Sequence, residues 1–372
     1  MSGILEKYVK LKSRGLFAIS IIFSLAVIVI VFWITFTDET IEYILSFNIL
    51  FLLLAIGFRL LALGLWGVRI VLLSRSLGYP VSLLHSLNMV LAGLLAGTMT
   101  PGQAGGEPVR VHELYRAGLK VGDATAVVIM ERVLDGIILT VTGIIIMLMT
   151  SEIWSTFSKS LIILIVIAWI FLLSFLFIPF LAMRYPVPMK TLILRLVSWI
   201  TGKLSHTRLS SSGICTRADH EIDNFFNCFN RFAGPARSGL LAGVCVTGFF
   251  WITEFMVASV ILMGLGLDPH IVLSFFFQIL IAIIMMVPTT PGSSGITELS
   301  TSSLYALIVP AGMLGIFVLL WRFVTFYLNI ILGTMAGMYI VHREISLRTG
   351  NSKGPEPGEP VMEMAENKNK GG

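Results

Sequence analysis

The chain has 372 residues, of which 56% are hydrophobic and 13% are charged, and its formal net charge is +5. About a quarter of the residues in a soluble domain are charged, so this composition excludes an ordinary water-soluble protein. Most basic residues lie in short loops, and no basic stripe is interleaved with aromatic residues, so a nucleic-acid-binding protein is excluded as well.

Long apolar runs without alternation predict membrane-spanning helices, because backbone groups in lipid need internal partners and a span needs about 20 apolar residues. Hydropathy gives seven to nine apolar segments, at about residues 16–36, 48–68, 82–99, 124–149, 160–182, 238–265, 271–287 and 304–341. The first run is too long for the core of a signal peptide and lacks a small-residue cleavage site, so we expect it to be retained. The sequence therefore predicts an all-α polytopic membrane protein with about six full transmembrane helices and two re-entrant helical hairpins.

The stretch 183–237 is the only large loop that is predicted between the apolar segments. Its first part places Lys190, Arg195 and Lys203 among apolar residues. This pattern is typical of a basic amphipathic helix on the membrane surface, or equally of an ordinary helix in a solvated loop. The tail 350–372 is rich in Gly, Pro, Glu, Asn and Lys and is expected to be disordered.

The same loop also contains Cys215, His220 and Cys228. Their spacing does not match that of a familiar zinc site, so we expect neither a metal nor another cofactor.

The distribution of Lys and Arg predicts the orientation, because cytoplasmic loops carry the excess of these residues. Residues 1–15 hold four, 183–237 holds eight and 342–372 holds five, whereas 37–47 and 266–270 hold none. If segment 82–108 crossed the membrane once, the eight basic residues of 183–237 would lie outside. A hairpin at 82–108 entering from the cytoplasm, and one at 271–309 entering from outside, instead place every basic loop and both termini in the cytoplasm.

The turns of the two hairpins share a sequence motif, TPGQAGGE at residues 100–107 and TPGSSGITE at 290–298. The hairpin turns are assigned to Pro101, Gly102, Pro291 and Gly292, because proline stops a helix and glycine permits a sharp turn.

A second correspondence comes from two arginines. Arg132 follows Pro101 by 31 positions, and Arg322 follows Pro291 by 31 positions. Because the two hairpins enter from opposite sides, this agreement predicts an inverted-topology repeat, as found in transporters. The predicted transmembrane domain is 1–349, with repeat one at about 48–150 and repeat two at about 238–341.

Few charged residues remain within the predicted spans and hairpins. They are Arg59, Glu107, Glu131, Arg132, Asp135, Glu254, Glu298 and Arg322. A charge at a helix centre costs about 2.5–3.5 kcal/mol on insertion scales, so such residues face a cavity or pair with one another. Glu131, Asp135 and Glu254 are assigned either to proton coupling or to salt bridges that lock the bundle, and the sequence leaves both roles open.

The hairpin turns predict an anion-binding site. A half-helix that begins after each turn offers free N–H groups and a positive dipole end. Arginine matches phosphate with two parallel hydrogen bonds. The predicted substrate-binding residues are therefore Arg59, Arg132, Arg322, Gly105, Gly106, Ser293, Ser294 and Gly295. Glu107 and Glu298 are expected either to carry protons or to cap the half-helices.

These residues resemble a known family. AGTMTPGQAGGEPVRVHEL at residues 96–114, ERVLD at 131–135, VPTTPGSSGITE at 287–298 and WRFVTFYLNIILG at 321–333 carry the resemblance. They are similar to the flippase-like transmembrane domain of lysylphosphatidylglycerol synthases and of stand-alone members without the synthase domain. The resemblance covers the chain to about residue 345. It implies movement of an aminoacylated phospholipid or another lipid between leaflets, without aminoacyl-transferase activity.

The sequence thus predicts a flippase that moves an anionic or phosphate-bearing lipid across a cell membrane. Its partner would be that lipid, and a soluble lipid-modifying enzyme could dock on the cytoplasmic side through 183–237. The alternative is a membrane-embedded enzyme, or an accessory subunit, of polyprenyl-phosphate or phospholipid modification. No nucleophile motif supports catalysis, so an enzyme is not expected.

Overall fold

The computed structural model describes residues 21–149, 159–203, 211–286 and 290–349. This part of the chain is built from helices, and its single extended pairing is an isolated bridge between two prolines. After the helix at residues 21–35, the elements are α2 (Thr40–Ser46), α3 (Ile49–Ser76), α4 (Leu83–Thr98), α5 (Gly106–Arg116), α6 (Val121–Met149), α7 (Lys159–Arg184), α8 (Pro186–Lys203), α9 (Ser211–Ala233), α10 (Arg237–Gly264), α11 (Ile271–Met286), α12 (Ile296–Tyr305), α13 (Ala311–Arg322), the π-helical turn η2 (Phe323–Tyr327) and α14 (Leu328–Thr349). The predicted all-α polytopic membrane fold is confirmed.

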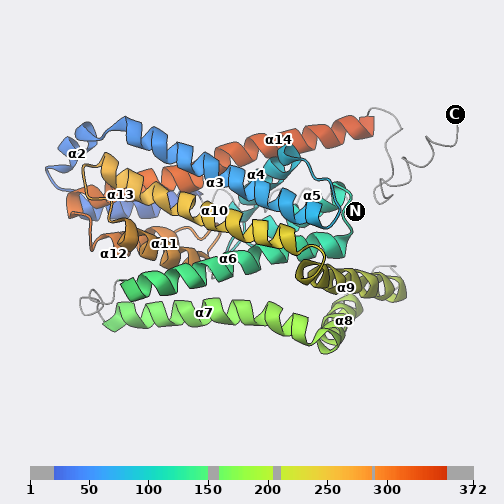
Figure 1. Ribbon diagram of the computed structural model, residues 1–372. Coiled ribbons are helices and arrows are strands. Elements are labelled where there is room, and N and C mark those ends of the chain that lie inside the picture. The colour runs from blue at the N-terminus through green and yellow to red at the C-terminus, as the bar shows by residue number, and fades with distance from the viewer. Residues whose placement is uncertain (1–20, 150–158, 204–210, 287–289, 350–372) are drawn as a thin grey trace.

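Four of the described helices are long and apolar enough to cross a membrane. They are α3, α6, α10 and the continuous stretch Ala311–Arg343 through α13, η2 and α14. The helix at residues 21–35 and α2 would make a fifth span as a pair, but the chain bends by 115° between them. α7 is 26 residues long and runs beside α6 (Figure 1). These elements lie at the positions of the six predicted spans, and by length and composition four of them, or five with the bent pair, can cross a membrane.

The long helices α3 and α10 form an antiparallel pair through the middle of the bundle (Figure 1). At one end, the N–H of Asn48 donates to the carbonyl oxygen of Gly264 over 3.1 Å. At the other end, Gly239 lies directly against Ser76, and a Cβ on this glycine would come within 2.2 Å of the serine Cβ. One helix opens each predicted repeat, so the two repeats lie side by side in opposite directions.

Each repeat contributes a helical hairpin, α4–α5 and α11–α12, and the two hairpins lie toward opposite ends of the bundle (Figure 1). Small residues let the first pair pack closely, since a Cβ on Gly106 would lie 2.8 Å from the carbonyl oxygen of Gly93. The tips of the hairpins meet inside the bundle. Pro101 and Pro291 form the isolated bridge, and the N–H of Gly292 donates to the Thr100 carbonyl over 3.0 Å.

The two hairpin turns also share their backbone conformation. The φ angles are 59° and 58° at Gly102 and Gln103, and 60° and 54° at Gly292 and Ser293. This left-handed region is uncommon for residues other than glycine. Both turns adopt this left-handed conformation at matching positions. Both hairpins therefore reverse direction at the same point of the repeat.

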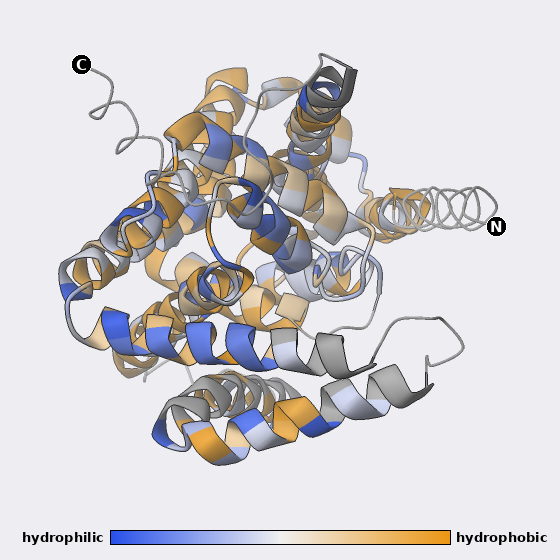
Figure 2. Ribbon diagram, turned by 90° about the vertical axis from the view of Figure 1, so that its right-hand side faces the viewer, coloured by the Kyte–Doolittle hydropathy of each residue, from blue (hydrophilic) through white to orange (hydrophobic). Residues whose placement is uncertain are grey.

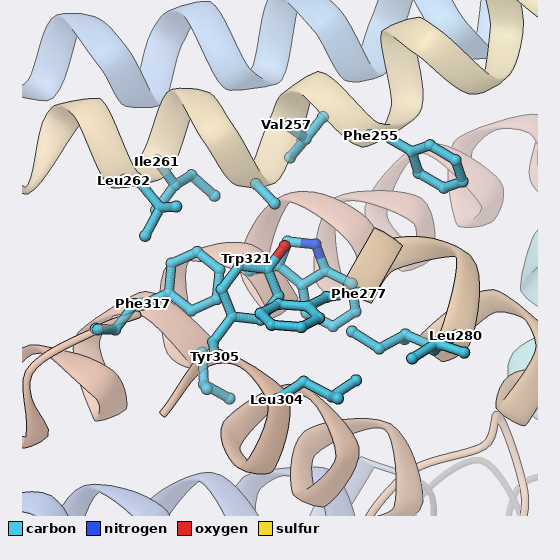
Figure 3. Close-up of a cluster of buried hydrophobic side chains, with 14 of the residues drawn as sticks. Phe255, Val257, Ile261, Leu262, Phe277, Leu280, Leu304, Tyr305, Phe317 and Trp321 are labelled. Atoms are coloured by element: carbon cyan, nitrogen blue, oxygen red, sulfur yellow. The ribbon is translucent and has the colours of Figure 1, made fainter. Parts of the chain in front are cut away.

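Two hydrophobic clusters hold the hairpins in place. One is built around α11, α12 and α13 and packs Tyr305 against Phe317 and Phe277, with ring centroids 4.3 and 5.4 Å apart (Figure 3). The hydroxyl of Tyr305 is hydrogen-bonded to Ser274 and Gln278 of the opposite arm, so its polar tip is satisfied inside the core. The other cluster packs α4, α5 and α6 against α3 and α9.

The loop 183–237 forms α8 and α9, which lie across one end of the bundle (Figure 2). A side-chain oxygen of Glu221 accepts from the N–H of Gly122 over 2.6 Å, which fixes α9 at the start of α6. Lys190 lies between Asp219 and Asp223, at 2.9 and 2.6 Å, and these contacts raise the pKa of Lys190. The ammonium group of Lys190 therefore faces α9.

This arrangement predicts which loops share a side of the membrane. We expect a membrane-impermeant maleimide to label single cysteines at Lys120 and Asn227 from one side, and a cysteine at Asp268 from the other. The reason is that α9 is held at the start of α6, whereas Asp268 follows the far end of α10. The background is Cys215→Ser, Cys228→Ala and Cys245→Ser. Labelling of Lys120→Cys and Asp268→Cys from the same side would contradict the hairpin arrangement.

Candidate functional site

A cavity of about 560 Å³ lies where the two hairpin tips meet. Its wall includes residues of α3, α4, α5, α6, α10, α11, η2 and α14. The apolar part is formed by Val90, Leu94, Ile129, Phe255, Ile281, Ala282, Met285 and Met286, among others. The charged part is formed by Arg59, Glu107, Arg110, Arg132, Asp135, Glu254 and Arg322. A hollow with both an apolar and a cationic wall suits an amphipathic anion.

The first hairpin and α6 supply a charged cluster on this wall. One oxygen, Glu107 Oε1, lies 3.3 Å from Arg110 Nη2 and 3.5 Å from Arg132 Nε. Arg110 is only 3% exposed, whereas the side chains of Glu107 and Arg132 are 35% and 23% exposed. Glu107 is therefore a carboxylate shared by two guanidinium groups and the most accessible member of the cluster.

The indole of Trp66 organises these guanidinium groups. The Cζ atoms of Arg69, Arg110 and Arg132 lie 5.8, 5.0 and 5.6 Å from the centroid of the ring. Such cation–π contacts contribute about 0.5–2 kcal/mol each. One residue of α3 thus holds three like charges close together while the surrounding acids offset their repulsion.

Behind the cavity wall lies a fully buried ion-pair network. Arg69 contacts Glu131 at 3.1 Å and Asp135 at 2.5 Å. The indole N–H groups of Trp66 and Trp251 donate to these same two acids, over 2.8 and 3.1 Å. Each acid also lies near a second arginine, Glu131 at 3.7 Å from Arg110 and Asp135 at 3.4 Å from Arg132, and each is oriented by one tryptophan. This geometry locks α3, α6 and α10 together.

A separate pair occupies the other side of the cavity. Arg59 pairs with Glu254 and donates from Nε and Nη2 to Asn329 Oδ1, over 3.1 and 3.0 Å. These three residues come from α3, α10 and α14, so both long helices of the middle pair contribute to the wall.

The arginine of the second repeat lies in a different environment. Arg322 contacts Glu298 Oε1 at 2.7 Å, and both side chains are buried. The other carboxylate oxygen accepts from the N–H of Gly295 over 2.6 Å, which caps α12. Ser24 of the N-terminal helix donates to Glu298 over 2.5 Å. Helix 21–35 thus covers the ion pair Arg322–Glu298, whereas the side chains around Arg132 face the cavity and are partly exposed.

The structure brings only part of the predicted set to the cavity. Arg59, Gly102, Gly106, Glu107, Arg132, Asp135, Glu254 and Arg322 are on the wall, and Pro101, Gly105, Glu131, Pro291, Gly292, Ser293, Ser294, Gly295 and Glu298 are not. Several N–H groups of the turns already have partners within the turns. Gly105 donates to Thr100 Oγ1 over 2.7 Å, and Gly106 donates to the Gln103 carbonyl over 3.2 Å. Guanidinium groups, not turn N–H groups, are therefore the donors that face a ligand.

Sequence reasoning missed Arg69, Arg110 and Trp66. Arg69 lies beyond the predicted end of the second apolar segment at residue 68, but α3 continues to Ser76. Arg110 lies just beyond the predicted hairpin 82–108, although it follows Glu107 by three positions in α5. That spacing places both side chains on one helix face and was the available signal.

Three donors of this cluster lack a hydrogen-bond partner within the described part of the chain. They are Nε and Nη1 of Arg110 and Nε of Arg132. The carboxylates of Glu131 and Glu107 lie 3.7 Å from Arg110 Nη1 and 3.5 Å from Arg132 Nε, as ion pairs without a hydrogen bond. Buried polar groups normally have hydrogen-bond partners, so these donors are available to an anion or to water in the cavity. No group of three or more His, Cys, Asp or Glu residues able to hold a metal ion is present among the described residues. An anion with several acceptor oxygens fits this donor set.

Comparison with known proteins supports a membrane family. The family model described as the lysylphosphatidylglycerol synthase TM region matches residues 17–333. A UPF0104 membrane protein of Archaeoglobus fulgidus is 34% identical, over 86% of this chain and 96% of its own length. A UPF0104 membrane protein of Pyrococcus horikoshii is 23% identical, over 84% of this chain and 94% of its own length. A further one from Methanothermobacter thermautotrophicus is 24% identical, over 67% of this chain and 72% of its own length.

The two kinds of arginine predict different effects on stability. We expect Arg69→Met to lower the free energy of unfolding by about 3–5 kcal/mol, because two buried carboxylates lose their counter-ion. Arg132→Gln should lower it by less than about 1 kcal/mol, since its side chain is partly exposed. Denaturant titration of both variants in detergent measures the difference. Equal losses would show that Arg69 does not lock the bundle.

Proposed function

This chain belongs to the lysylphosphatidylglycerol synthase TM region family, and we propose that it moves a phosphate-bearing lipid between the leaflets of a membrane. The observation that carries the proposal is the cavity at the meeting point of the two hairpin tips. Its cationic wall contains Arg110 and Arg132, which have N–H donors that make no hydrogen bond to the described residues. A polar head group that crosses the membrane needs such a hollow at the point where the hairpins meet.

The phosphate binds to the pair Arg110 and Arg132. Guanidinium groups match phosphate oxygens with two parallel hydrogen bonds, and their N–H donors cannot be satisfied by the apolar residues opposite. The lipid tails stay in the bilayer, and the part of the lipid next to the head group lies against the apolar wall near Met285 and Met286. This division of the cavity suits the two chemical ends of a lipid.

Glu107 occupies the place that we propose for the phosphate. Its Oε1 atom bridges Arg110 and Arg132, as a phosphate oxygen would. An arriving phosphate displaces this carboxylate, and the carboxylate takes the position back when the phosphate leaves. Exchange between two anions of similar geometry keeps the arginines paired throughout, so neither guanidinium is left without a counter-ion.

The contact between the hairpin tips separates the two ends of the bundle. Because each hairpin enters from a different end, a small displacement of one relative to the other opens the cavity toward one side at a time. Inverted repeats in transporters work by such rocking around a fixed site. This movement breaks the hydrogen bond from the Gly292 N–H to the Thr100 carbonyl oxygen.

Transport tests the role of the two arginines. We expect Arg110→Gln and Arg132→Gln each to slow translocation of fluorescent phosphatidylglycerol in liposomes by at least about tenfold, since each removes a charge-assisted contact with phosphate. Arg75→Gln is the control, because Arg75 is exposed at the end of α3 and lies outside the cavity. Unchanged translocation in both cavity variants would overturn the proposal, and a chemically altered lipid in the recovered vesicles would indicate an enzyme.

If Glu107 competes with phosphate for the two arginines, neutralising this acid should raise the affinity of the protein for the lipid. We expect Glu107→Gln to bind short-chain phosphatidylglycerol about tenfold more tightly, because the amide no longer competes as an anion for Arg110 and Arg132. Isothermal titration calorimetry in detergent measures the dissociation constant. Glu42→Gln, an exposed position on α2, should leave it unchanged. Weaker binding of the Glu107 variant would mean that this acid holds the arginines in place instead of competing with the ligand.

A further inference from the structure

The wall of the central cavity carries a second set of polar groups, apart from Arg110 and Arg132. It consists of Glu254 of α10, Gln278 of α11 and Trp321 of α13, and is here called the second polar wall. We propose that the second polar wall binds hydroxyl groups, so that the lipid in this cavity carries a polyol, a glycerol or a sugar, on its phosphate. This inference rests on the proposed function, because it takes the phosphate at the two arginines as one end of the ligand.

Glu254 offers one carboxylate oxygen to the cavity. Its Oε2 atom is paired with Arg59, whereas Oε1 accepts no hydrogen bond from the described residues. The side chain of Glu254 is 18% exposed and lies on the cavity wall. Arg59 also donates to Asn329 from two nitrogens, so the carboxylate is held in a fixed position. An acceptor held in this way suits a ligand group that donates a hydrogen bond, such as a hydroxyl.

Gln278 adds an amide that is bound at one end only. Its Nε2 atom donates to the hydroxyl of Tyr305 over 2.9 Å, and this hydroxyl is also bound to Ser274 over 2.7 Å. The amide oxygen accepts no hydrogen bond from the part of the chain that the structure describes, although Gln278 is buried and lies on the cavity wall. A buried amide oxygen normally has a donor, and a hydroxyl in the cavity supplies one.

The indole of Trp321 brings a donor to the same wall. Trp321 is 4% exposed and belongs to the buried cluster that contains Phe277 and Tyr305 (Figure 3), and it also lies on the cavity wall. Its N–H group has no hydrogen-bond partner among the described residues. An indole N–H can only donate, and in a buried tryptophan it usually has an acceptor. The oxygen of a ligand hydroxyl provides that acceptor.

This combination of groups discriminates between head groups. Hydroxyl groups both donate and accept, so they satisfy the oxygens of Glu254 and Gln278 and the N–H of Trp321. An ionised second phosphate brings only acceptors and would face the carboxylate. An ammonium group brings only donors and would meet the positive charge of Arg59, which already balances Glu254. A polyol is therefore the chemical class that matches this wall.

The spacing along α3 fits a head group that is longer than a phosphate. Arg59 and Trp66 both lie on the cavity wall, and the seven residues from one to the other rise by about 10.5 Å. Trp66 stacks against Arg110 and Arg132, whereas Arg59 holds Glu254. The two sets of polar groups are thus anchored about two helical turns apart. A group attached to the phosphate, and not the phosphate itself, meets the second polar wall.

Binding of matched lipids to the full chain in detergent tests the proposal. The probes have the same short tails and are phosphatidylglycerol, phosphatidylpropanol, which has the same charge but no hydroxyl group on its head group, and phosphatidylethanolamine, which has an ammonium group. Isothermal titration calorimetry measures each Kd. We expect the wild type to bind phosphatidylglycerol at least about tenfold more tightly than either of the others, because those lipids leave buried polar groups unpaired.

Two variants test where this preference arises. Trp321→Phe removes the N–H group and Gln278→Leu removes the amide, and each should lower the preference for phosphatidylglycerol over phosphatidylpropanol by at least about threefold. Arg132→Gln should weaken both lipids and keep their ratio, because both carry the phosphate. Trp33→Phe is the matched control and should change neither Kd, since Trp33 is 83% exposed and lies outside the cavity wall. Thermal unfolding identifies a variant that fails to fold, and Trp321→Phe, which breaks no hydrogen bond between described residues, keeps the test decisive.

The outcomes separate this inference from the proposed function. Equal binding of phosphatidylglycerol and phosphatidylpropanol by the wild type overturns the polyol assignment, and so does tighter binding of phosphatidylethanolamine. An unchanged ratio in both Trp321→Phe and Gln278→Leu overturns the role of the second polar wall. These results leave the proposed function standing as long as Arg132→Gln weakens the binding of each lipid. Failure of the wild type to bind any of the three lipids overturns the proposed function together with the inference.

Discussion

A guanidinium group that lies inside a membrane needs a counter-ion or hydrogen-bond partners, because the hydrocarbon around it supplies neither. Five arginines meet this condition in the middle of the bundle: Arg59, Arg69, Arg110, Arg132 and Arg322. The acids that offset them are Glu107, Glu131, Asp135, Glu254 and Glu298, which come from α5, α6, α10 and α12. The positions of α3, α5, α6, α10, α12 and α13 relative to one another follow from these pairs as much as from apolar packing.

The two halves of the molecule share a backbone arrangement but place their arginines in different environments. Both hairpins turn through the same left-handed conformation, and each half places an arginine at the same distance after its turn. In the second half, Ser24 of helix 21–35 and the capped start of α12 close the pair Arg322–Glu298. In the first half, the cluster around Arg132 remains open to the cavity. Both arginines are on the wall of the cavity between the two tips, but Arg322 is held in a buried ion pair whereas Arg132 is partly exposed.

Particular residues show where reasoning from the sequence succeeded. The basic residues of 183–237 required a hairpin at the first glycine-rich turn, and the repeated TPG motif located the second. Both hairpins are present, and their tips meet at Pro101 and Pro291. The match of the family model to residues 17–333 confirms the resemblance carried by these motifs. The stacking of three guanidinium groups around Trp66 was not foreseen, because tryptophan is common in apolar helices and its partners are far away in the chain.

By itself, the sequence determined the helical membrane class, the two hairpins and the presence of charges within the membrane, because these follow from local hydropathy, turn residues and loop charge. The tertiary structure decided which acid pairs with which arginine. Arg69 makes the shortest contacts with Glu131 and Asp135, Arg322 pairs with Glu298, and Glu107 is shared by Arg110 and Arg132, which also lie near Glu131 and Asp135. Ion pairing depends on distances between helices that are far apart in the chain, and no local pattern encodes those distances. For the same reason, the sequence did not show which charged side chains are held in buried ion pairs and which face the cavity.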